Sequence, residues 1–407
     1  MMKKTIAFFI LAVVAAVSLI VPAGGQSATA AEAAAFDMEN NEIYLILKDF
    51  VQTHPKRSAF SQEEKAAAAY IEEQFADAGL ADVRQLQFNY GTDSSQNVGG
   101  RIYASSITAK TVIIGAHYDN DVNGASDGTF DNGGGVASLI YIARRLADAE
   151  LPFNVDIVAF GAEEYGMIGS YFYVAQTLDA ENTLLFVNID MIAGGDMLYA
   201  YGEDVRTDFE DFFVEASEKA GVAVPLRNMP GNKRVTTMFA GASGLPYFHA
   251  AQNSDQVYFR NAGVPSLLIF SGNMSSKYFG FVEAESYPGG LSHTANDNLE
   301  FFKATFGNSF VDKMQSVADT VVAALSDSAF ADVAQNAEKE LVSDVWRKTG
   351  VPTIVFAVIL AALVVWGILY YKKLVKDSIL GDGAANGKKF FSKPDVEDIF
   401  DFKDKRK

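Results

Sequence analysis

The stretch VDIVAFGAEEYGMIGS, residues 155–170, joins a short apolar run to two adjacent carboxylates. The run Val155–Phe160 has the length and composition of a buried strand, and helical periodicity begins near Ile168 and continues to Leu178. Glu163 and Glu164 follow the strand, although neighbouring like charges make each other harder to ionise. A strand that has reached solvent explains such a pair as ordinary surface charge. The alternative is that the pair belongs to a site.

Apolar runs and helical segments alternate on both sides of this stretch. Upstream, Thr111–Ala116 predicts a strand and Val136–Leu146 a helix, and downstream Leu184–Ile189 predicts a third strand. The other predicted elements are helices over about Asn41–Thr53, Ser61–Gly79 and Leu299–Leu325 and strands over Met197–Tyr201 and Pro265–Phe270. Ser61 and Glu64 form a capping box. The alternation predicts an α/β fold, a three-layer sandwich in which helices flank a mostly parallel central sheet.

The composition limits what the protein can be. The 407 residues suffice for one large or two ordinary domains, and a hydrophobic content of 49% is ample for a core. The 51 acidic residues outnumber the 33 basic ones, for a net charge of −18, so nucleic acid is not an expected partner. The chain has no cysteine, which excludes disulfides, thiolate metal sites and a cysteine nucleophile. Any metal ion must be held by His, Asp and Glu.

The N-terminus has the pattern of an export signal. Lys3 and Lys4 precede the apolar run Thr5–Val21, and a stretch of small residues follows it. Within that stretch, Ala28-Thr29-Ala30 fits a signal-peptidase site. Residues 1–30 are therefore predicted to be a signal peptide, which places the following domain outside the cytoplasm.

A second apolar segment, Val351–Tyr371, is uncharged and long enough to cross a hydrocarbon core of roughly 30 Å. Lys372 and Lys373 follow it, as expected for a cytoplasmic flank, and a buried helix of the main domain is the alternative. The predicted layout is a main domain over 36–326, a stalk over 327–350, a transmembrane helix over 351–371 and a cytoplasmic tail over 372–407. This layout predicts a single-pass protein of the cell membrane.

Residues that can bind a metal ion stand at the ends of the central strands and in two nearby loops. They are His117, Asp119, Asp131, Glu163, Glu164, Asp190 and His293. The first strand runs into His117 and Asp119, the second into the glutamate pair and the third into Asp190. The carboxyl ends of parallel strands share one edge of a sheet, where ligands bind. Histidine and carboxylate ligands suit zinc without thiolates.

Taken singly, these residues also have ordinary structural explanations. His117 is explained equally by a histidine at a strand end whose hydrogen bonds are all made, and Asp131 by a helix cap. Asp190 is explained by an aspartate in a turn, and His293 by a histidine in a loop. The placement of acids or histidine at three strand ends on one edge favours a metal site. His54 and His249 match none of these positions and are predicted to be structural.

Five segments stand in order along the chain: HYDN at 117–120, DNGGGVA at 131–137, GAEEYGMIGS at 161–170, NIDM at 188–191 and SHTANDN at 292–298. Together they resemble the motifs of the M28 metallopeptidases, the co-catalytic zinc aminopeptidases. The resemblance runs from about residue 40 to 325 and includes SQNVGGRI and SDQVYFRNAGVPSLLI. It implies a zinc aminopeptidase (phosphorylase/hydrolase-like) fold, peptide substrates and removal of N-terminal residues.

The resemblance implies a role for each position. His117 and Asp190 would hold one zinc ion, Glu164 and His293 a second, and Asp131 would bridge the two, which predicts two zinc ions per chain. Glu163 would be the general base, and Asp119 would orient His117. Zinc acidifies a water molecule and polarises the scissile carbonyl, so a carboxylate that is not a ligand must move the proton.

The chain departs from the family pattern at two positions. Gln256 stands where a histidine often follows Ser-Asp, and Ser292 stands where many members have a tyrosine that steadies the oxyanion. Neither position is an expected ligand, so the predicted metal site is unaffected. Tyr258 or Tyr287 is a candidate substitute for that tyrosine.

Three functions remain open. The first is an exported, membrane-tethered aminopeptidase. The second is a transferase similar to the one-zinc glutaminyl cyclases, which share the fold and retain similar ligands. The third is a non-catalytic ectodomain, although such domains usually lose ligands that this chain keeps. Substrate specificity depends on loops such as Arg227–Phe248, and neither specificity nor oligomeric state has a readable pattern.

Overall fold

The structure, a computed structural model, describes residues 37–121, 126–202, 208–230, 254–274, 283–287, 290–334 and 361–372. The described residues up to 334 belong to one folded unit, and residues 361–372 belong to a second.

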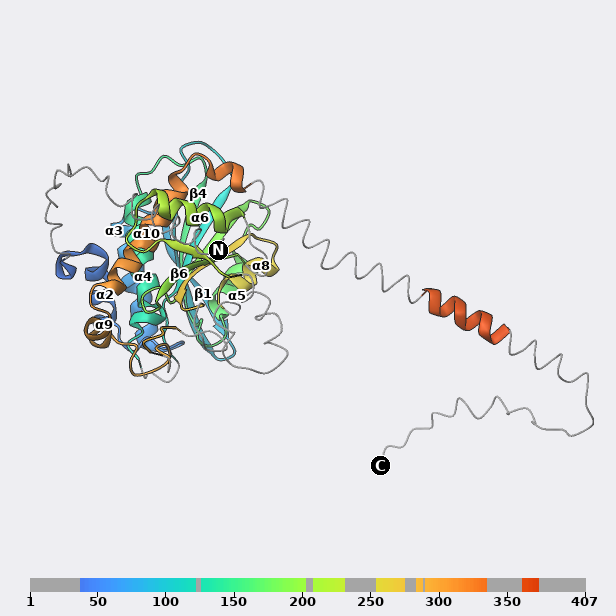
Figure 1. The fold of residues 1–407 in the computed structure, drawn as a ribbon, viewed down its shortest axis with the longest axis horizontal. Helices are drawn as coiled ribbons and strands as arrows, with labels where there is room; N and C mark the ends of the chain where they lie inside the picture. Colours follow the sequence, from blue (N-terminus) through green and yellow to red (C-terminus); the bar gives the residue numbers. More distant parts are fainter. Residues whose placement is uncertain are drawn as a thin grey trace, which may run out of the picture. The chain divides into compact units, whose positions relative to one another are not determined.

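An eight-stranded sheet runs through the first unit (Figure 1). The strands are β1 (Ala81–Tyr90), β2 (Asp93–Ile102), β3 (Thr111–His117), β4 (Asn154–Phe160), β5 (Thr183–Ile189), β6 (Met197–Tyr201), β7 (Leu226–Asn228) and β8 (Ser266–Gly272). Their order is β1-β2-β4-β3-β5-β8-β6-β7. The four central strands β4, β3, β5 and β8 are mutually parallel. The antiparallel β1–β2 hairpin pairs with β4 at one side, and β6 pairs antiparallel with β8 at the other.

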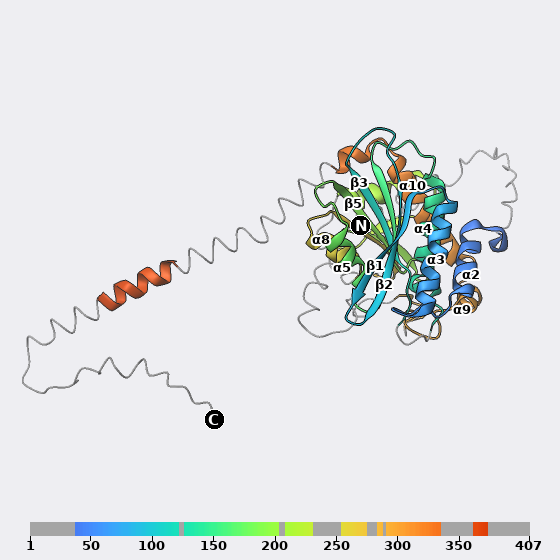
Figure 2. The same cartoon turned by 180° about the vertical axis from the view of Figure 1, so that it is seen from behind.

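The central strands are buried on both faces. In β3, Val112 and Ile114 join the larger hydrophobic cluster and Ile113 joins a smaller one, because successive side chains point to opposite faces. The helices of the larger cluster are α2 (Glu42–Thr53), α3 (Gln62–Asp77), α4 (Gly134–Leu146), α6 (Asp208–Lys219), α9 (Leu299–Phe306) and α10 (Ser309–Ser326). Tyr173 of α5 (Ile168–Gln176) and Phe259 of α8 (Gln256–Asn261) cover the other face. Figures 1 and 2 show these two groups of helices on opposite sides of the sheet, which confirms the predicted three-layer sandwich.

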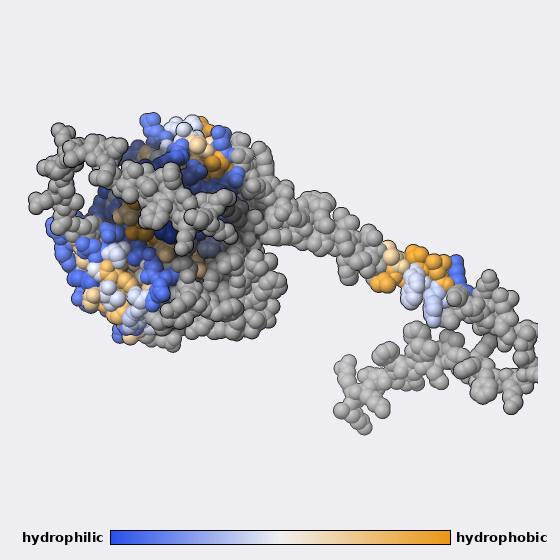
Figure 3. Space-filling model, in the orientation of Figure 1, coloured by the Kyte–Doolittle hydropathy of each residue, from blue (hydrophilic) through white to orange (hydrophobic). Residues whose placement is uncertain are grey.

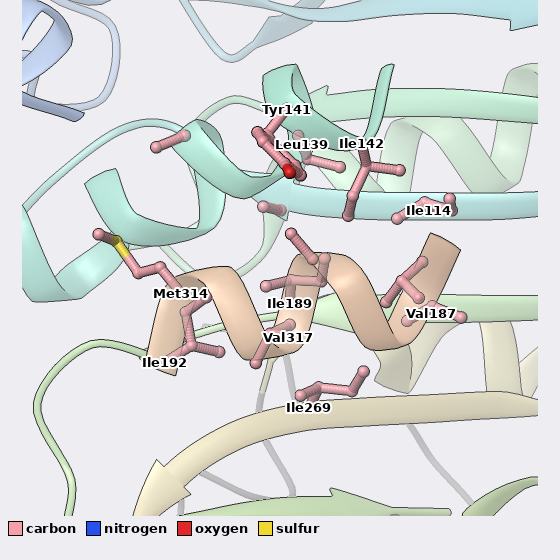
Figure 4. Packing of buried hydrophobic residues seen from close by; sticks show 14 of the residues in the cluster. Ile114, Leu139, Tyr141, Ile142, Val187, Ile189, Ile192, Ile269, Met314 and Val317 are labelled. Atoms are coloured by element: carbon pink, nitrogen blue, oxygen red, sulfur yellow. The ribbon is translucent and has the colours of Figure 1, made fainter. Parts of the chain in front are cut away.

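Close packing against the sheet fixes the crossover helix α4. Figure 4 shows Leu139 of α4 and Met314 and Val317 of α10 beside Ile114 of β3 and Val187 of β5. All five side chains are fully buried. This packing positions the segment just before α4, which carries Asp131, near the carboxyl ends of β3 and β5.

The structure corrects one predicted helix and adds elements that were not predicted. The single helix predicted over Leu299–Leu325 is wrong, because Gly307, with φ 56° and ψ −128°, separates α9 from α10. The β1–β2 hairpin, α6, β7 and α8 were not predicted. Ser61 caps α3 as predicted, with its hydroxyl accepting the N–H of Glu64.

In the second unit, residues 361–372 are helical and exposed. Figure 3 shows hydrophobic residues along most of this helix. Within the described stretches, no helix combines the length and the apolar character needed to span a bilayer. Residues 351–360 of the predicted transmembrane segment and the whole predicted signal peptide lie outside the described residues. The membrane tether and the signal therefore stay predictions.

Candidate metal centre

The candidate ligands meet at the carboxyl edge of the parallel strands. His117 is the last residue of β3 and is level with Phe160, the last residue of β4, just before the glutamate pair. Asp190 directly follows β5, Asp131 lies in the segment Thr129–Gly133 before α4, and His293 lies in the loop before α9. The topology thus brings together side chains that are up to 176 residues apart in the sequence.

Five side chains form two groups that share Asp131. In the first group, Nε2 of His117 lies 3.1 Å from Oδ1 of Asp131 and 3.3 Å from Oδ1 of Asp190. In the second, Nε2 of His293 lies 3.2 Å from Oδ2 of Asp131 and 2.8 Å from Oε2 of Glu164. Each carboxylate oxygen of Asp131 therefore faces a different histidine, as a bridging ligand requires.

The geometry fits a pair of zinc ions. Within each group the ligand atoms all lie within 4.8 Å of one another. Two ligands of a tetrahedral zinc ion, each about 2.0–2.1 Å from the metal, are about 3.3–3.4 Å apart, close to three of the four distances above. Oε1 of Glu164 is buried and has no hydrogen-bond partner within the described part of the chain, so this oxygen is available to a cation. Nitrogen and oxygen donors without thiolate suit zinc.

The buried carboxylates face too little positive charge. Burial raises the pKa of Glu164 to about 7, and the negative charge of Asp131 adds to the shift. Burial also raises the pKa of Glu163 far above its usual range; Asp255 and Glu164 add to this shift and His117 opposes it. Hydrogen bonds to Asp131 and Glu164 raise the pKa of His293 to about 12. Two divalent cations would supply the missing positive charge.

Asp119 holds the turn that carries the glutamate pair. Its carboxylate accepts the N–H of Glu163 at 2.9 Å and the N–H of Glu164 at 3.1 Å. Its Oδ1 lies 3.6 Å from Nδ1 of His117, whereas its own backbone carbonyl lies nearer to that nitrogen, at 3.2 Å. A proton on Nδ1 directed at this carbonyl leaves Nε2 of His117 free for a metal ion. Asp119 thus contacts both His117 and the two glutamates.

Asp297 ties the segment of Asp131 to the loop of His293, a role that was not predicted. Its carboxylate accepts the N–H of Phe130 at 2.6 Å and the N–H of Asp131 at 3.1 Å. Burial raises the pKa of this fully enclosed side chain far above its usual range, and Asp131 and Asp127 add to the shift. The motif SHTANDN contains Asp297, but its sequence does not indicate which backbone groups the carboxylate contacts.

Asp255 is a further buried acid whose charge interacts with the site. Burial raises its pKa to about 7, and the negative charges of Asp190 and Asp119 add to the shift. It stands in the segment SDQVYF, which resembles the family's sequence but does not indicate a role for this residue. The surplus of negative charge at the site is therefore larger than the predicted ligands alone indicate.

The two departures from the family pattern have partners away from the metal groups. The hydroxyl of Ser292 donates to Oε1 of Glu283, and Oε1 of Gln256 accepts from Nδ2 of Asn188 at 2.9 Å. The ring of Tyr258 packs against Tyr171 with centroids 5.3 Å apart. The residue that steadies the oxyanion stays a prediction.

The ring of His54 packs against two aromatic side chains, which also contact each other. Its centroid lies 5.4 Å from that of Tyr70 and 5.9 Å from that of Phe50. Burial lowers the pKa of His54, as expected for a neutral packed imidazole. His249 lies outside the described residues.

Three non-glycine residues at the site adopt left-handed backbone conformations. Ala162 has φ 54° just before the glutamate pair, Met191 has φ 49° just after Asp190, and His293 itself has φ 55°. Such conformations are uncommon for residues with a side chain and persist where the surrounding structure enforces them, often at functional sites. These conformations lie next to the candidate ligands, which indicates that the fold tolerates a less stable backbone there in order to orient the ligand side chains.

Comparisons with known proteins point to one family. The profile of peptidase family M28 matches residues 97–318. The probable lipoprotein aminopeptidase LpqL of Mycobacterium tuberculosis (strain ATCC 25618 / H37Rv) is 33% identical over 175 residues, which cover 40% of this chain and 32% of that protein. Leupeptin-inactivating enzyme 1 of Streptomyces exfoliatus is 26% identical over 271 residues, which cover 65% of this chain and 53% of that enzyme. The matched part therefore spans about a third to about half of these relatives.

Solved structures share the fold at low sequence identity. BSAP, a zinc aminopeptidase from Bacillus subtilis, is 16% identical with a TM-score of 0.54 over 71% of this chain and 94% of that one. A glutaminyl cyclase from Bacteroides thetaiotaomicron is 19% identical with a TM-score of 0.53 over 72% of this chain and 98% of that one. The family match covers more than half of the 407 residues and contains all five side chains of the two metal groups. The chain belongs to peptidase family M28.

Proposed function

We propose that this protein is an exported, membrane-tethered, zinc-dependent aminopeptidase that removes N-terminal residues from peptides. The observation that carries the proposal is the position of Asp131, whose two carboxylate oxygens face His117 and His293 separately. Family membership and the aminopeptidases among the similar proteins support the activity. Export and tethering rest on the sequences of residues 1–30 and 351–371.

Different residues would bind the metal ions and transfer the proton during hydrolysis. His117 and Asp190 would hold one zinc ion, Glu164 and His293 the other, and Asp131 both. When bound, the ions would acidify a water molecule and polarise the scissile carbonyl. Glu163 belongs to neither metal group. A carboxylate that is not a ligand would accept a proton from water and return it to the leaving amine.

Two other functions compete with this proposal. A glutaminyl cyclase-like transferase is supported by the fold shared with the bacterial cyclase. The two ligand groups suit the two zinc ions of the proposed aminopeptidase, but one-zinc cyclases retain similar ligand residues, so the reaction product separates the two functions. A non-catalytic ectodomain is disfavoured because all five candidate ligands and Glu163 are present and the ligands converge.

Metal analysis and a substrate panel test the proposal on the full chain in detergent. We expect about two zinc ions per chain, release of leucine from leucyl peptides and loss of that release after chelation. A peptide with N-terminal glutamine separates the alternatives, since an aminopeptidase frees glutamine and a cyclase frees ammonia and leaves the peptide chain intact. A metal-free protein that releases neither product would contradict both enzymatic proposals.

A further inference from the structure

Three aromatic side chains, Phe60, Tyr90 and Tyr165, form an aromatic cluster beside the glutamate pair. The rings of Phe60 and Tyr90 are stacked, with centroids 6.1 Å apart and an interplanar angle of 9°. Tyr165 meets these two rings edge-on, with centroids 5.2 Å from Phe60 and 6.0 Å from Tyr90. Tyr90 is 44% exposed and Tyr165 is 54% exposed, so these two adjoining rings present apolar surface to solvent. Contiguous exposed surfaces of this kind often mark binding sites.

The cluster and the metal groups lie on opposite sides of the glutamate pair. In the strand order, β4 stands between the β1–β2 hairpin on one side and β3 and β5 on the other. His117 and Asp190 belong to β3 and to the end of β5, whereas Tyr90 ends β1 in the hairpin. Oδ1 of Asn97 in β2 accepts the N–H of Gly161, so the hairpin turn extends beyond the end of β4 (Figure 2). A peptide lying across this edge would pass the metal groups, then Glu163 and then the cluster.

Glu64 links the aromatic cluster to the turn that carries Glu163 and Glu164. Its Oε2 accepts the N–H of Phe60 at 2.7 Å, and its Oε1 accepts the N–H of Ala162 at 3.0 Å. Glu64 is fully buried, and the hydroxyl of Ser95 donates to the same Oε1 at 2.6 Å. Phe60, with φ 65°, and Ala162, with φ 54°, are both held in the left-handed region. A bulky residue rarely adopts this conformation unless the surrounding structure enforces it, so the backbone that carries the Phe60 ring is held in place.

The chemistry of Glu163 indicates which part of a peptide reaches the cluster. The proton that Glu163 takes from water is passed to the leaving amine, so that nitrogen must lie within hydrogen-bond reach of the Glu163 carboxylate. The residue after the scissile bond begins at this nitrogen. With the scissile carbonyl at the metal groups, that residue extends away from them, toward the side of the sheet where the cluster lies.

We propose that the aromatic cluster binds the side chain of the residue after the scissile bond and favours peptides whose second residue is aromatic or large and apolar. This inference rests on the proposed aminopeptidase function. Aromatic rings that meet edge-on or in offset stacks gain affinity beyond the burial of apolar area. The exposed rings of Tyr90 and Tyr165 can supply such contacts, whereas a glycine second residue makes none of them.

The test compares Leu-Phe-amide with Leu-Gly-amide, which share the same N-terminal residue. We expect kcat/KM to be about tenfold higher for Leu-Phe-amide. Tyr90→Ala and Tyr165→Ala should each lower this preference to about twofold, and Tyr165→Phe should preserve it. Tyr103→Ala is the matched control, because Tyr103 is an equally exposed tyrosine, 57%, just beyond the other end of β2. It should leave the preference unchanged.

Uncleavable analogues separate the cluster from the proposed function. Binding of the two dipeptide amides with a reduced CH2–NH link is measured by calorimetry on the same variants. In one outcome the protein binds the phenylalanine analogue more tightly, through Tyr90 and Tyr165, without hydrolysing the natural amides. That result would support the proposed role of the cluster and contradict the aminopeptidase function. If the wild type and both alanine variants hydrolyse the amides with the same preference for Leu-Phe-amide over Leu-Gly-amide, the proposed role of the cluster is wrong and the aminopeptidase function stands. Neither hydrolysis nor a binding preference would overturn both.

Discussion

Glu163 and Glu164 are adjacent in the chain but have different surroundings. Oε2 of Glu164 lies 2.8 Å from Nε2 of His293, whereas Glu163 is in neither metal group. Glu163→Gln should therefore keep about two zinc ions per chain while kcat falls roughly 10²-fold or more, because the proton carrier is lost. Glu164→Gln should lower zinc affinity itself. Metal content by mass spectrometry and kinetics on a leucyl substrate check this, and equal zinc loss in both variants would contradict the assignment.

Asp297 offers a test of how Asp131, the candidate bridging ligand, is held in position. Both of its carboxylate oxygens accept backbone N–H groups, from Phe130 and Asp131. In Asp297→Asn one of these N–H groups would face an amide NH2 instead, so the segment of Asp131 should shift. We expect zinc affinity to fall roughly 10–100-fold, as when other groups that orient metal ligands are changed. Competition with a zinc-binding dye measures this affinity. Asp49→Asn, which alters an exposed bond to Tyr70, should leave it unchanged.

At the level of residues, the sequence predicts the convergence of the candidate ligands better than it predicts the residues that support them. His117 and Asp190 follow apolar strands in recognisable motifs, so their convergence follows from the topology. Glu64 was predicted as a capping-box residue, yet its side chain accepts from Phe60 and Ala162. A buried carboxylate that contacts the backbone of distant segments has no sequence pattern, because its partners are set by the tertiary fold.

At the level of elements, the break between α9 and α10 depends on one glycine. Gly307 has φ 56° and ψ −128°, a conformation that residues with a Cβ rarely adopt. Gly307→Ala should therefore lower the free energy of unfolding by about 1–3 kcal/mol, although the new Cβ would meet no neighbouring atom. Thr305→Ala, an exposed change within α9, should alter it by less than about 0.5 kcal/mol. Urea unfolding measures both values. Equal effects of the two substitutions would show that the backbone conformation of Gly307 is not required.

The elements that were missed differ physically from those that were predicted. Strands β3, β4 and β5 are apolar on both faces, so each appears in the sequence as a continuous hydrophobic run. Strand β2 buries polar side chains instead. Nε2 of Gln96 donates to the Tyr118 hydroxyl at 2.8 Å, and Nδ2 of Asn97 donates to the carbonyl of Gly169 at 2.9 Å. Buried polar residues satisfied by distant partners do not produce a hydrophobic pattern, so the hairpin could not be identified from periodicity.

At the level of the whole molecule, the layer architecture and the edge that carries the site could be predicted, because both follow from the order of apolar runs and helices. The placement of the domain relative to a membrane depends on segments 1–30 and 351–371, which stay predictions. The net charge of −18 includes acids enclosed within the fold, where desolvation raises the pKa values of Glu163, Glu164 and Asp255. Metal binding, stability and pH should therefore be coupled.

That coupling predicts how the stability of the folded unit changes with pH. In the metal-free protein the pKa of Glu164 is raised from 4.5 to about 7 and that of Asp255 from 3.8 to about 7. Between these values the folded state binds more protons than the unfolded state, so the stability of the metal-free protein should fall as pH rises from about 4 through about 7. Bound zinc would compensate the negative charge and remove this loss.

The difference in Tm between zinc-loaded and chelated protein should therefore widen as pH rises from 5 to 8. Thermal unfolding of the full chain in detergent, at matched ionic strength and with free zinc buffered, measures it. Glu163→Gln separates metal binding from activity, because it should retain zinc and still show a widening, reduced by the loss of one acid with a raised pKa, while kcat falls roughly 10²-fold or more. A difference in Tm that stays constant or narrows with rising pH would mean that the buried acids are not the groups neutralised by the metal ions.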